Sequence, residues 1–166
     1  MDGGDRLGEL YEQHVHAAYR LGFFLTGDRE LASDLVQDAF VRLISRFRHL
    51  GSPERFDQYL RRTIVNLAAS HFRHRSVERR YLAGPQGPRN VDQAFPDIET
   101  RETLWLQLQR LPARQRAALV LRYYEDLSEE QTGVILGISA RAVNALMSRA
   151  LETLRKKEGE HDGTRR

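Results

Sequence analysis

The 166-residue sequence predicts an all-α protein of two small helical domains joined by a flexible linker, with a helix-turn-helix in the C-terminal domain. Three observations lead to this fold class. Apolar residues recur at spacings of three and four along most of the chain, a glycine- and proline-rich stretch breaks that pattern, and residues 128–155 carry the capping signals of two successive helices. We expect the domains at residues 1–82 and 98–158 and the linker at residues 83–97.

Residues 1–82 are expected to form three amphipathic helices. The first ends at Thr26-Gly27-Asp28, a segment that also caps the next helix. The third begins at Ser52-Pro53, a cap followed by a proline at the first helical position, and runs to about Arg80. The apolar stripes consist of Leu7, Leu10, Tyr11, Ala18, Leu21 and Leu25; of Ala32, Leu35, Val36, Ala39, Phe40, Leu43 and Phe47; and of Phe56, Tyr59, Leu60, Ile64, Leu67, Ala68 and Phe72.

The linker prediction depends on three of the five prolines, which fall between Gly84 and Asp97 in a stretch without helical period. After it, a short helix is expected up to Leu111. A second helix starts at Pro112 and carries an apolar stripe that includes Leu119, Val120 and Tyr123.

The helix-turn-helix follows. Ser128 and Gln131 form a capping box, Gly137 supplies the turn, and Ser139 opens a second helix that frays from about Gly159. The apolar positions of that helix are Val143, Leu146, Met147, Ala150, Leu151 and Leu154. Such a unit is typical of DNA readers, although helical hairpins also occur in proteins that never contact nucleic acid.

Charge is distributed unevenly along the first domain. Residues 1–41 hold eight acids and three arginines, whereas residues 42–80 hold ten arginines and three acids. This pattern indicates one cationic and one anionic partner, with solvated helix faces as the alternative explanation.

Composition and motifs argue against an enzyme. The chain has no cysteine, which excludes disulfides, thiolate metal sites and a catalytic thiol. The histidine spacings do not suit a metal site, common catalytic and phosphate-binding motifs are missing, and Asp34 and Asp38 would lie one turn apart on an open surface. The sequence also shows neither a signal peptide nor a membrane-length apolar run. We therefore expect a cytoplasmic protein without cofactor, metal ion or membrane contact.

Four motifs follow one another along the chain: Asp34-Leu-Val-Gln-Asp-Ala-Phe-Val-Arg-Leu43, Tyr59-Leu-Arg-Arg-Thr-Ile-Val-Asn-Leu67, Leu111-Pro-Ala-Arg-Gln-Arg116 and Leu121-Arg-Tyr-Tyr-Glu-Asp-Leu-Ser128. In this order they resemble the extracytoplasmic-function (group IV) class of bacterial RNA polymerase sigma factors. The resemblance covers both predicted domains and the linker. Arginine outnumbers lysine 24 to 2, which is typical of a GC-rich, actinobacterial source.

The resemblance implies two roles for the first domain. Asp34, Gln37 and Asp38 would dock on a coiled coil of the polymerase β′ subunit. The following helix and the loop before it would recognise and melt the promoter −10 element, with arginines on phosphates and aromatic and amide groups on unstacked bases. The candidates for −10 contact are Leu50, Tyr59, Arg61, Arg62, Asn66, Arg73 and Arg75. Tyr59 has a core position as its alternative, because it shares a stripe with Leu60 and Ile64.

The second domain would read the −35 element, with its last helix in the major groove. Many members have G-T-V-K-S or G-T-V-R-S at the start of that helix, whereas this chain has Arg141-Ala-Val-Asn-Ala145. The cation is thus missing at Asn144, which gains the ability to pair with an adenine edge, and one occurs instead at Arg141. The −35 candidates are Arg141, Asn144, Ala145, Ser148 and Arg149.

The resulting interpretation is a sigma factor that directs promoter-specific initiation and aids strand opening. Its expected partners are core RNA polymerase, through the β′ and β subunits, and promoter DNA; an anti-sigma factor is left open. The alternatives are a helix-turn-helix regulator that binds duplex DNA without polymerase and a nuclease, for which the sequence offers no metal-carboxylate cluster.

Overall fold

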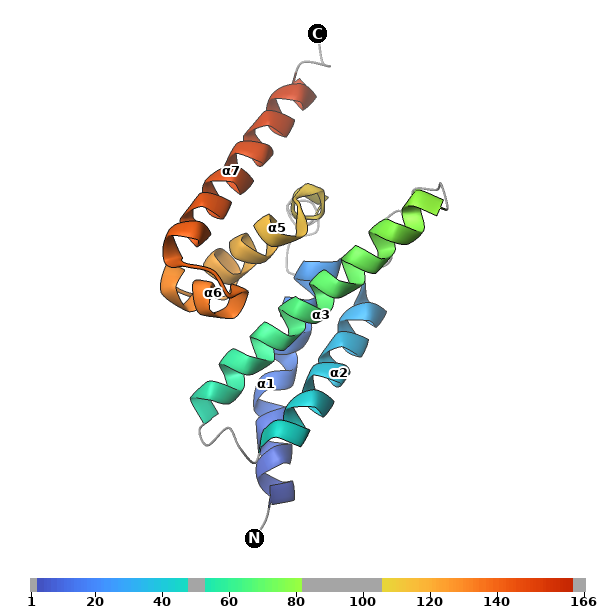
Figure 1. Ribbon diagram of the computed structural model, residues 1–166, viewed down its shortest axis with the longest axis vertical. Coiled ribbons are helices and arrows are strands. Elements are labelled where there is room, and N and C mark those ends of the chain that lie inside the picture. Colours follow the sequence, from blue (N-terminus) through green and yellow to red (C-terminus); the bar gives the residue numbers. More distant parts are fainter. Residues whose placement is uncertain (1–2, 48–52, 82–105, 163–166) are drawn as a thin grey trace. The chain divides into compact units, whose positions relative to one another are not determined.

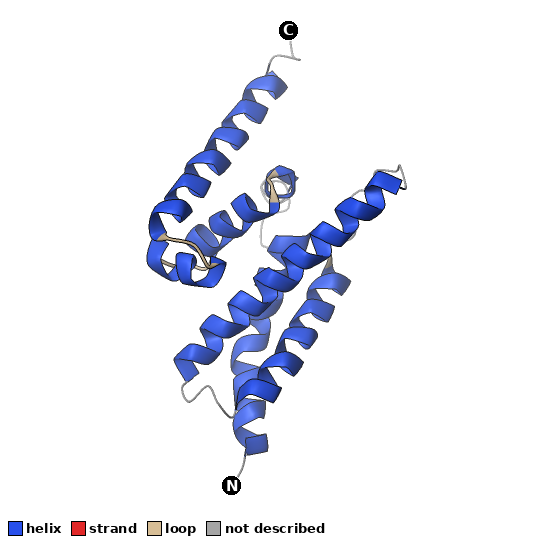
Figure 2. Ribbon diagram, viewed as in Figure 1, coloured by secondary structure: helices blue, strands red, loops and turns tan. Residues whose placement is uncertain are grey.

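The computed structural model describes residues 3–47, 53–81 and 106–162, and these ranges contain helices and turns but no strand (Figures 1 and 2). The chain divides into two compact units, Met1–Asp92 and Gln93–Arg166. The expected cap at Ser52, the expected linker at 83–97 and most of the expected helix before Leu111 lie outside the described residues.

The first unit contains α1 (Gly3–Thr26), α2 (Arg29–Phe47) and α3 (Pro53–Tyr81), each of which contacts the other two. The expected stripes supply most of the buried side chains, and Phe56, Ile64 and Leu21 are among the most completely enclosed. Helices α1 and α2 approach closely at Gly22, where an added side-chain carbon would lie only 3.4 Å from Ala32. The predicted three-helix arrangement is therefore present, with small residues where two helices cross.

The turn between α1 and α2 has the predicted chemistry. Gly27 adopts a φ of 69°, which favours glycine, and the Thr26 hydroxyl donates a hydrogen bond to the Gly22 carbonyl oxygen at 2.8 Å. Asp28 Oδ1 accepts a hydrogen bond from the Leu31 amide at 3.1 Å and so caps α2. These contacts confirm the expected end of one helix and start of the next.

Two tyrosines of the expected stripes are not in the core. Tyr11 is exposed, and its ring contacts Phe40 with 4.8 Å between ring centroids. Tyr59 is 42% exposed, so the alternative that placed it in the core is wrong. A period of 3.6 residues assigns a residue to a stripe but does not decide whether it lies at the stripe's edge, where a phenol keeps its hydroxyl in water.

The second unit contains α5 (Ala113–Leu119), a π-helix η1 (Val120–Tyr124), α6 (Glu129–Leu136) and α7 (Ala140–Asp162), with α5 and α6 both packed against α7. Pro112 caps α5 rather than beginning it. The π-helix was not expected from the sequence, and its Glu125 amide donates to the Val120 carbonyl oxygen at 3.1 Å. The extra residue in this turn rotates later side chains by about 100°, which explains why Tyr123, expected in the core, is 69% exposed.

A buried arginine joins α5 to the helical segment before it. The Arg116 guanidinium donates to the carbonyl oxygens of Leu108 at 2.8 Å, Leu111 at 3.0 Å and Gln109 at 3.1 Å. These carbonyls lie at a helix end, where α-helical partners run out. The Leu108 carbonyl oxygen also accepts a hydrogen bond from the Leu111 amide at 3.2 Å. Burial lowers the pKa of Arg116 to about 10, which leaves it protonated at neutral pH. This arginine therefore stabilises the unit and is not available to an outside partner.

The helix-turn-helix has the expected caps. The Gln131 amide donates to Ser128 Oγ at 3.1 Å, and the Ser128 amide donates to Gln131 Oε1 at 2.9 Å, which completes the capping box. Gly137 has a φ of 68°, and Ser139 Oγ accepts from the Ala142 amide at 3.1 Å. Helix α7 continues to Asp162, beyond Gly159, the residue from which the sequence predicts fraying.

Candidate functional site

An acidic surface lies on the side of α2 that faces away from the core. Asp34 and Gln37 are exposed, and Asp38 is partly exposed in an ion pair with Arg42, whose Nε is 2.9 Å from Asp38 Oδ1. The spacing of three and four residues places Asp34, Gln37 and Asp38 on one helix face. The structure thus brings the three predicted polymerase-binding residues together.

The same face of α2 continues into apolar side chains. Val41 is 65% and Ile44 is 42% exposed. They follow Asp34 and Gln37 at spacings of seven, which is two turns of helix. We call Asp34, Gln37, Asp38, Val41 and Ile44 the α2 surface. The two apolar members were not predicted from the sequence, although their position seven residues after the polar ones is a signal that could have identified them.

Helix α3 gathers four of the seven predicted −10 residues on one face. Tyr59, Arg62, Asn66 and Arg73 are all exposed, and at 3.6 residues per turn they fall within about 60° of one another. We call these four residues the α3 surface. Leu50 lies outside the described residues.

The other two predicted −10 residues, Arg61 and Arg75, lie on the opposite side of α3 and are partly buried. Arg61 forms an ion pair with Asp57. The second oxygen of that carboxylate is 3.5 Å from His14 Nδ1 on α1. Arg61 is therefore held within the helical bundle, whereas its neighbour Arg62 points to solvent.

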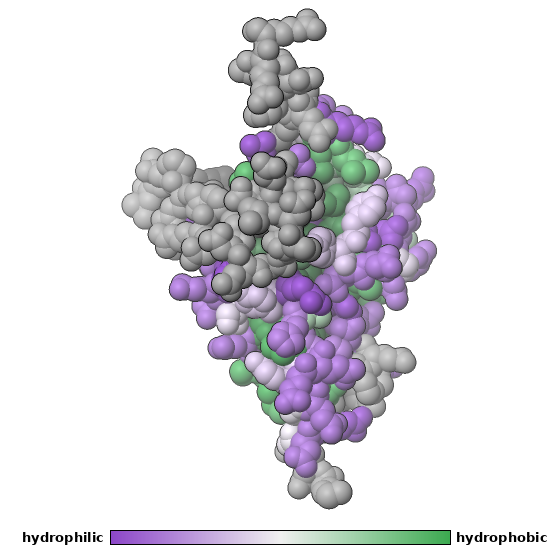
Figure 3. All heavy atoms as spheres, turned by 180° about the vertical axis from the view of Figure 1, so that it is seen from behind, coloured by the Kyte–Doolittle hydropathy of each residue, from purple (hydrophilic) through white to green (hydrophobic). Residues whose placement is uncertain are grey.

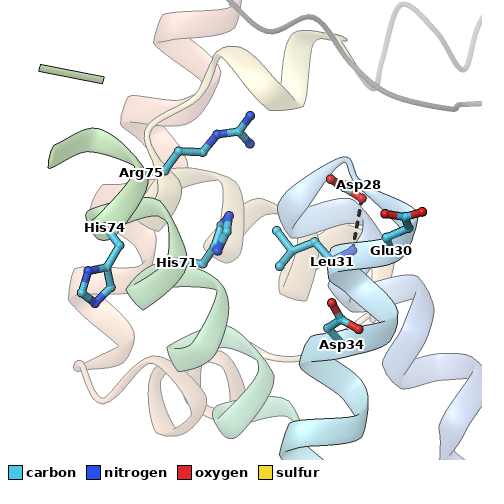
Figure 4. A pocket seen from close by; sticks show the side chains of 7 residues that line it. All are labelled: Asp28, Glu30, Leu31, Asp34, His71, His74 and Arg75. Carbon is cyan, nitrogen blue, oxygen red and sulfur yellow. Dashed lines mark hydrogen bonds between the residues drawn. The ribbon is translucent and has the colours of Figure 1, made fainter. Parts of the chain in front are cut away.

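Arg75 lines an open pocket of about 430 Å³ between α2 and α3. Figure 4 shows His71 extending from α3 toward Leu31 of α2, with the carboxylates on the α2 side. The pocket is lined by Asp28, Glu30, Leu31, Asp34, His71, His74 and Arg75. Asp34 thus belongs both to the α2 surface and to a pocket that contains basic groups of α3.

The start of α7 exposes all five predicted −35 residues. Val143 and Ala150 are buried, while Leu146 and Met147, which were expected in the core, are only partly buried. The exposed residues of the recognition surface are Arg141, Asn144, Ala145, Ser148 and Arg149. Asn144 Nδ2 donates a hydrogen bond to Glu129 Oε1 of α6 at 3.1 Å.

Hydrophilic side chains cover most of the described surface visible in Figure 3, with smaller apolar areas between them. Across residues 3–47, 53–81 and 106–162, no group of three or more His, Asp or Glu side chains is placed to hold a metal ion. Within the same ranges no single helix is long and apolar enough to cross a membrane; α6 and α7 satisfy that test only together, across a bend of 95°.

Family models match both units. The sigma-70 region 2 model matches residues 10–77, and the sigma-70 region 4 model matches residues 101–154. The RNA polymerase sigma-E factor of Streptomyces coelicolor is 32% identical over 157 residues, which cover 90% of this chain and 88% of that protein. The chain belongs to the extracytoplasmic-function (ECF) family of RNA polymerase sigma factors.

Other relatives agree with this assignment. The RNA polymerase sigma-E factor of Streptomyces avermitilis is 33% identical, over 90% of this chain and 86% of its own length. The ECF RNA polymerase sigma factor SigE of Mycolicibacterium smegmatis is 31% identical over 92% of the chain, which spans 62% of that relative. These relatives confirm the sequence resemblance to sigma factors, and actinobacterial proteins are among them.

Solved structures share the fold. The sigma factor RpoE of Bartonella quintana, in complex with the anti-sigma factor NepR, has a TM-score of 0.74 at 22% identity, over 90% of this chain and 94% of that chain. CnrH, in complex with the cytosolic domain of CnrY, has a TM-score of 0.67 at 21% identity, over 93% and 88% of the two chains.

As an ECF sigma factor, the protein binds core RNA polymerase and promoter DNA in transcription initiation. The helix-turn-helix that was expected from the sequence lies within the region 4 match. A stand-alone helix-turn-helix regulator would leave the region 2 match over residues 10–77 unexplained.

Proposed function

We propose that the two units divide promoter recognition between them. Residues 1–82 dock on core polymerase and engage the −10 element, residues 98–158 read the −35 element, and residues 83–97 join them. The protein is then a dissociable cytoplasmic specificity subunit that has no chemistry of its own. The observation that carries this proposal is the position of three separate sets of exposed residues, on α2, α3 and α7, each on the face left free after helix packing.

The α2 surface supports the docking role. Its carboxylates would steer the protein toward a cationic partner, while Val41 and Ile44 provide apolar area that a partner can cover. The partner surface would be the β′ coiled coil, with contacts to β elsewhere. The charge of Asp38 is partly neutralised by its ion pair with Arg42, so Asp34 and Gln37 are more available to the β′ coiled coil.

The α3 surface supports the −10 role. Arg62 and Arg73 are eleven residues apart and span about 16 Å of helix, enough to follow several phosphates of one strand. Tyr59 offers a ring for stacking on an unpaired base, and Asn66 offers an amide for its edge. Because Arg61 is engaged in an ion pair with Asp57, we consider Arg62 the stronger candidate for a phosphate contact. Leu50 and Arg75 complete the proposed set of −10 contacts.

The recognition surface supports the −35 role. Arg149 is our candidate for a guanine edge, Asn144 for an adenine edge, and Arg141 for a phosphate. Ala145 and Ser148 lie between them and allow the helix to approach the groove closely.

We also propose that an anti-sigma protein regulates the factor. RpoE of Bartonella quintana was solved in complex with the anti-sigma factor NepR. In this chain, the exposed apolar residues of the α2 surface would suit such a partner as well as polymerase, which would make the two competitive. Copurification from native cells, followed by identification of any small bound protein, tests this regulation.

Run-off transcription with purified core polymerase tests the proposed function. We expect promoter-specific transcripts only when both proteins are present, and weak promoter binding by this protein alone. Tight binding to duplex DNA without polymerase, together with unchanged transcription by core enzyme, would instead establish the helix-turn-helix regulator.

A further inference from the structure

The two helices of the helix-turn-helix are joined by a polar contact outside their turn. Glu129 is the first residue of α6, and its Oε1 accepts the hydrogen bond from Asn144 Nδ2 of α7 at 3.1 Å. The two residues are fifteen positions apart in sequence. Asn144 is exposed on the recognition surface, so the contact acts on a side chain that is available to DNA.

The contact sets the orientation of the Asn144 amide. An ionised carboxylate only accepts hydrogen bonds, so the NH₂ group of Asn144 must face Glu129 and its carbonyl oxygen must face away. One N–H is used by Glu129, which leaves one N–H and the oxygen. These are the donor and acceptor that the N7 and N6 atoms of adenine require in the major groove.

We propose that Glu129 is a positioning residue of −35 recognition, which restricts Asn144 to an adenine edge by fixing its amide. This inference rests on the proposed function, because it assumes that the recognition surface contacts the −35 element. Without Glu129 the amide can rotate by half a turn and exchange donor and acceptor, which would let other base edges pair equally well.

Glu129 is not needed to cap α6. Ser128 and Gln131 already complete the capping box. Glu129 and Glu130 both lie in the first turn of α6, where a negative charge is favourable, so that effect is common to both residues. Glu130 therefore provides a matched control for charge, helix stability and general repulsion of DNA.

The test measures promoter binding by the reconstituted holoenzyme on a set of templates that carry each base at each −35 position. The variants are Glu129→Gln, Glu130→Gln, Asn144→Ala and the double variant of Glu129 and Asn144. Glutamine keeps the length of the side chain but can both donate and accept, so it no longer selects one amide orientation.

We expect Glu129→Gln to reduce the adenine preference at one −35 position by at least about fivefold, since a bidentate contact discriminates by roughly 1–3 kcal/mol. Asn144→Ala should lose the same preference at the same position. In the Asn144→Ala background, Glu129→Gln should change that preference no further. Glu130→Gln should alter affinity for all templates alike.

Three results overturn the inference: equal effects of Glu129→Gln and Glu130→Gln on every template, a changed preference at a position that Asn144→Ala does not affect, or additive losses in the double variant. Failure of the proposed function is seen separately, as wild-type holoenzyme without promoter preference. Circular dichroism of each variant confirms that the helices are retained.

Discussion

A side-chain carbon at Gly133 would lie 2.6 Å from the carbonyl oxygen of Ile138. The backbone of α6 is held against its own turn by a hydrogen bond from the Ile138 amide to the Gly133 carbonyl oxygen at 2.9 Å. Because the clashing atom belongs to the backbone, it cannot move aside as a flexible side chain would. We expect Gly133→Ala to destabilise the second unit by about 1–3 kcal/mol, measured by urea unfolding and by amide exchange in the full chain.

Gly8 provides the matched control. It lies within α1, and a side-chain carbon there would meet nothing within 4 Å. Gly8→Ala should therefore stabilise the first unit by about 0.5–1 kcal/mol, because alanine loses less entropy in a helix. If both substitutions changed the free energy of unfolding in the same direction, the close approach at Ile138 would not be a constraint.

The hydroxyl of Thr132 is fully buried in α6 and has no hydrogen-bond partner among the described residues. Thr132→Val replaces it with a methyl group of similar shape and should stabilise the protein by about 1 kcal/mol in urea unfolding. Thr132→Ser keeps the hydroxyl and removes the methyl group, and should destabilise by a similar amount. A less stable valine variant would show that the hydroxyl has a partner in solution.

Charge reversal on the α2 surface tests docking. Replacing Asp34 and Asp38 together by arginine should abolish assembly with core polymerase in a pull-down and leave the helix content unchanged, because both positions would then repel a cationic surface. Reversing Glu9 and Glu12, two exposed acids of α1, is the control for net charge. Unchanged assembly in the α2 variant would move the docking site elsewhere.

Asn66 and Arg62 separate strand opening from general DNA binding. Asn66→Ala should reduce open-complex formation more than closed-complex binding, since its amide meets a base only after that base is unstacked. Arg62→Ala should weaken binding to duplex and pre-melted templates alike, because phosphates are present in both. Equal losses on both templates for Asn66→Ala would count against a base contact.

Arg149 and Arg141 are expected to make different kinds of DNA contact, with a base edge and with a phosphate. Arg149→Ala should relax the preference at one −35 position by roughly 1–3 kcal/mol, whereas Arg141→Ala should weaken all sequences alike and flatten the salt dependence. Binding of −35 variants at two salt concentrations distinguishes them. A uniform loss for Arg149→Ala would show that another residue makes the base contact.

Much of the fold could be predicted from the sequence because helix periodicity and caps are local. The end of α1 at Gly27 and the capping box of Ser128 and Gln131 follow from side chains within four residues of one another. The π-helix and the three carbonyl contacts of Arg116 could not be predicted in this way, since they depend on how α5 meets its neighbours.

The sequence by itself determined the chemistry of the surfaces: which helix carries carboxylates, which carries arginines, and which positions remain after the apolar stripe is assigned. Only the tertiary structure decided which of these groups are available. It places the Arg61–Asp57 pair of α3 beside His14 of α1 and leaves Arg62 exposed, and it joins Asn144 to Glu129 of another helix. The physical reason is that helix period fixes a residue's direction along its own helix, whereas its partners come from helices that are distant in sequence and meet it only through packing.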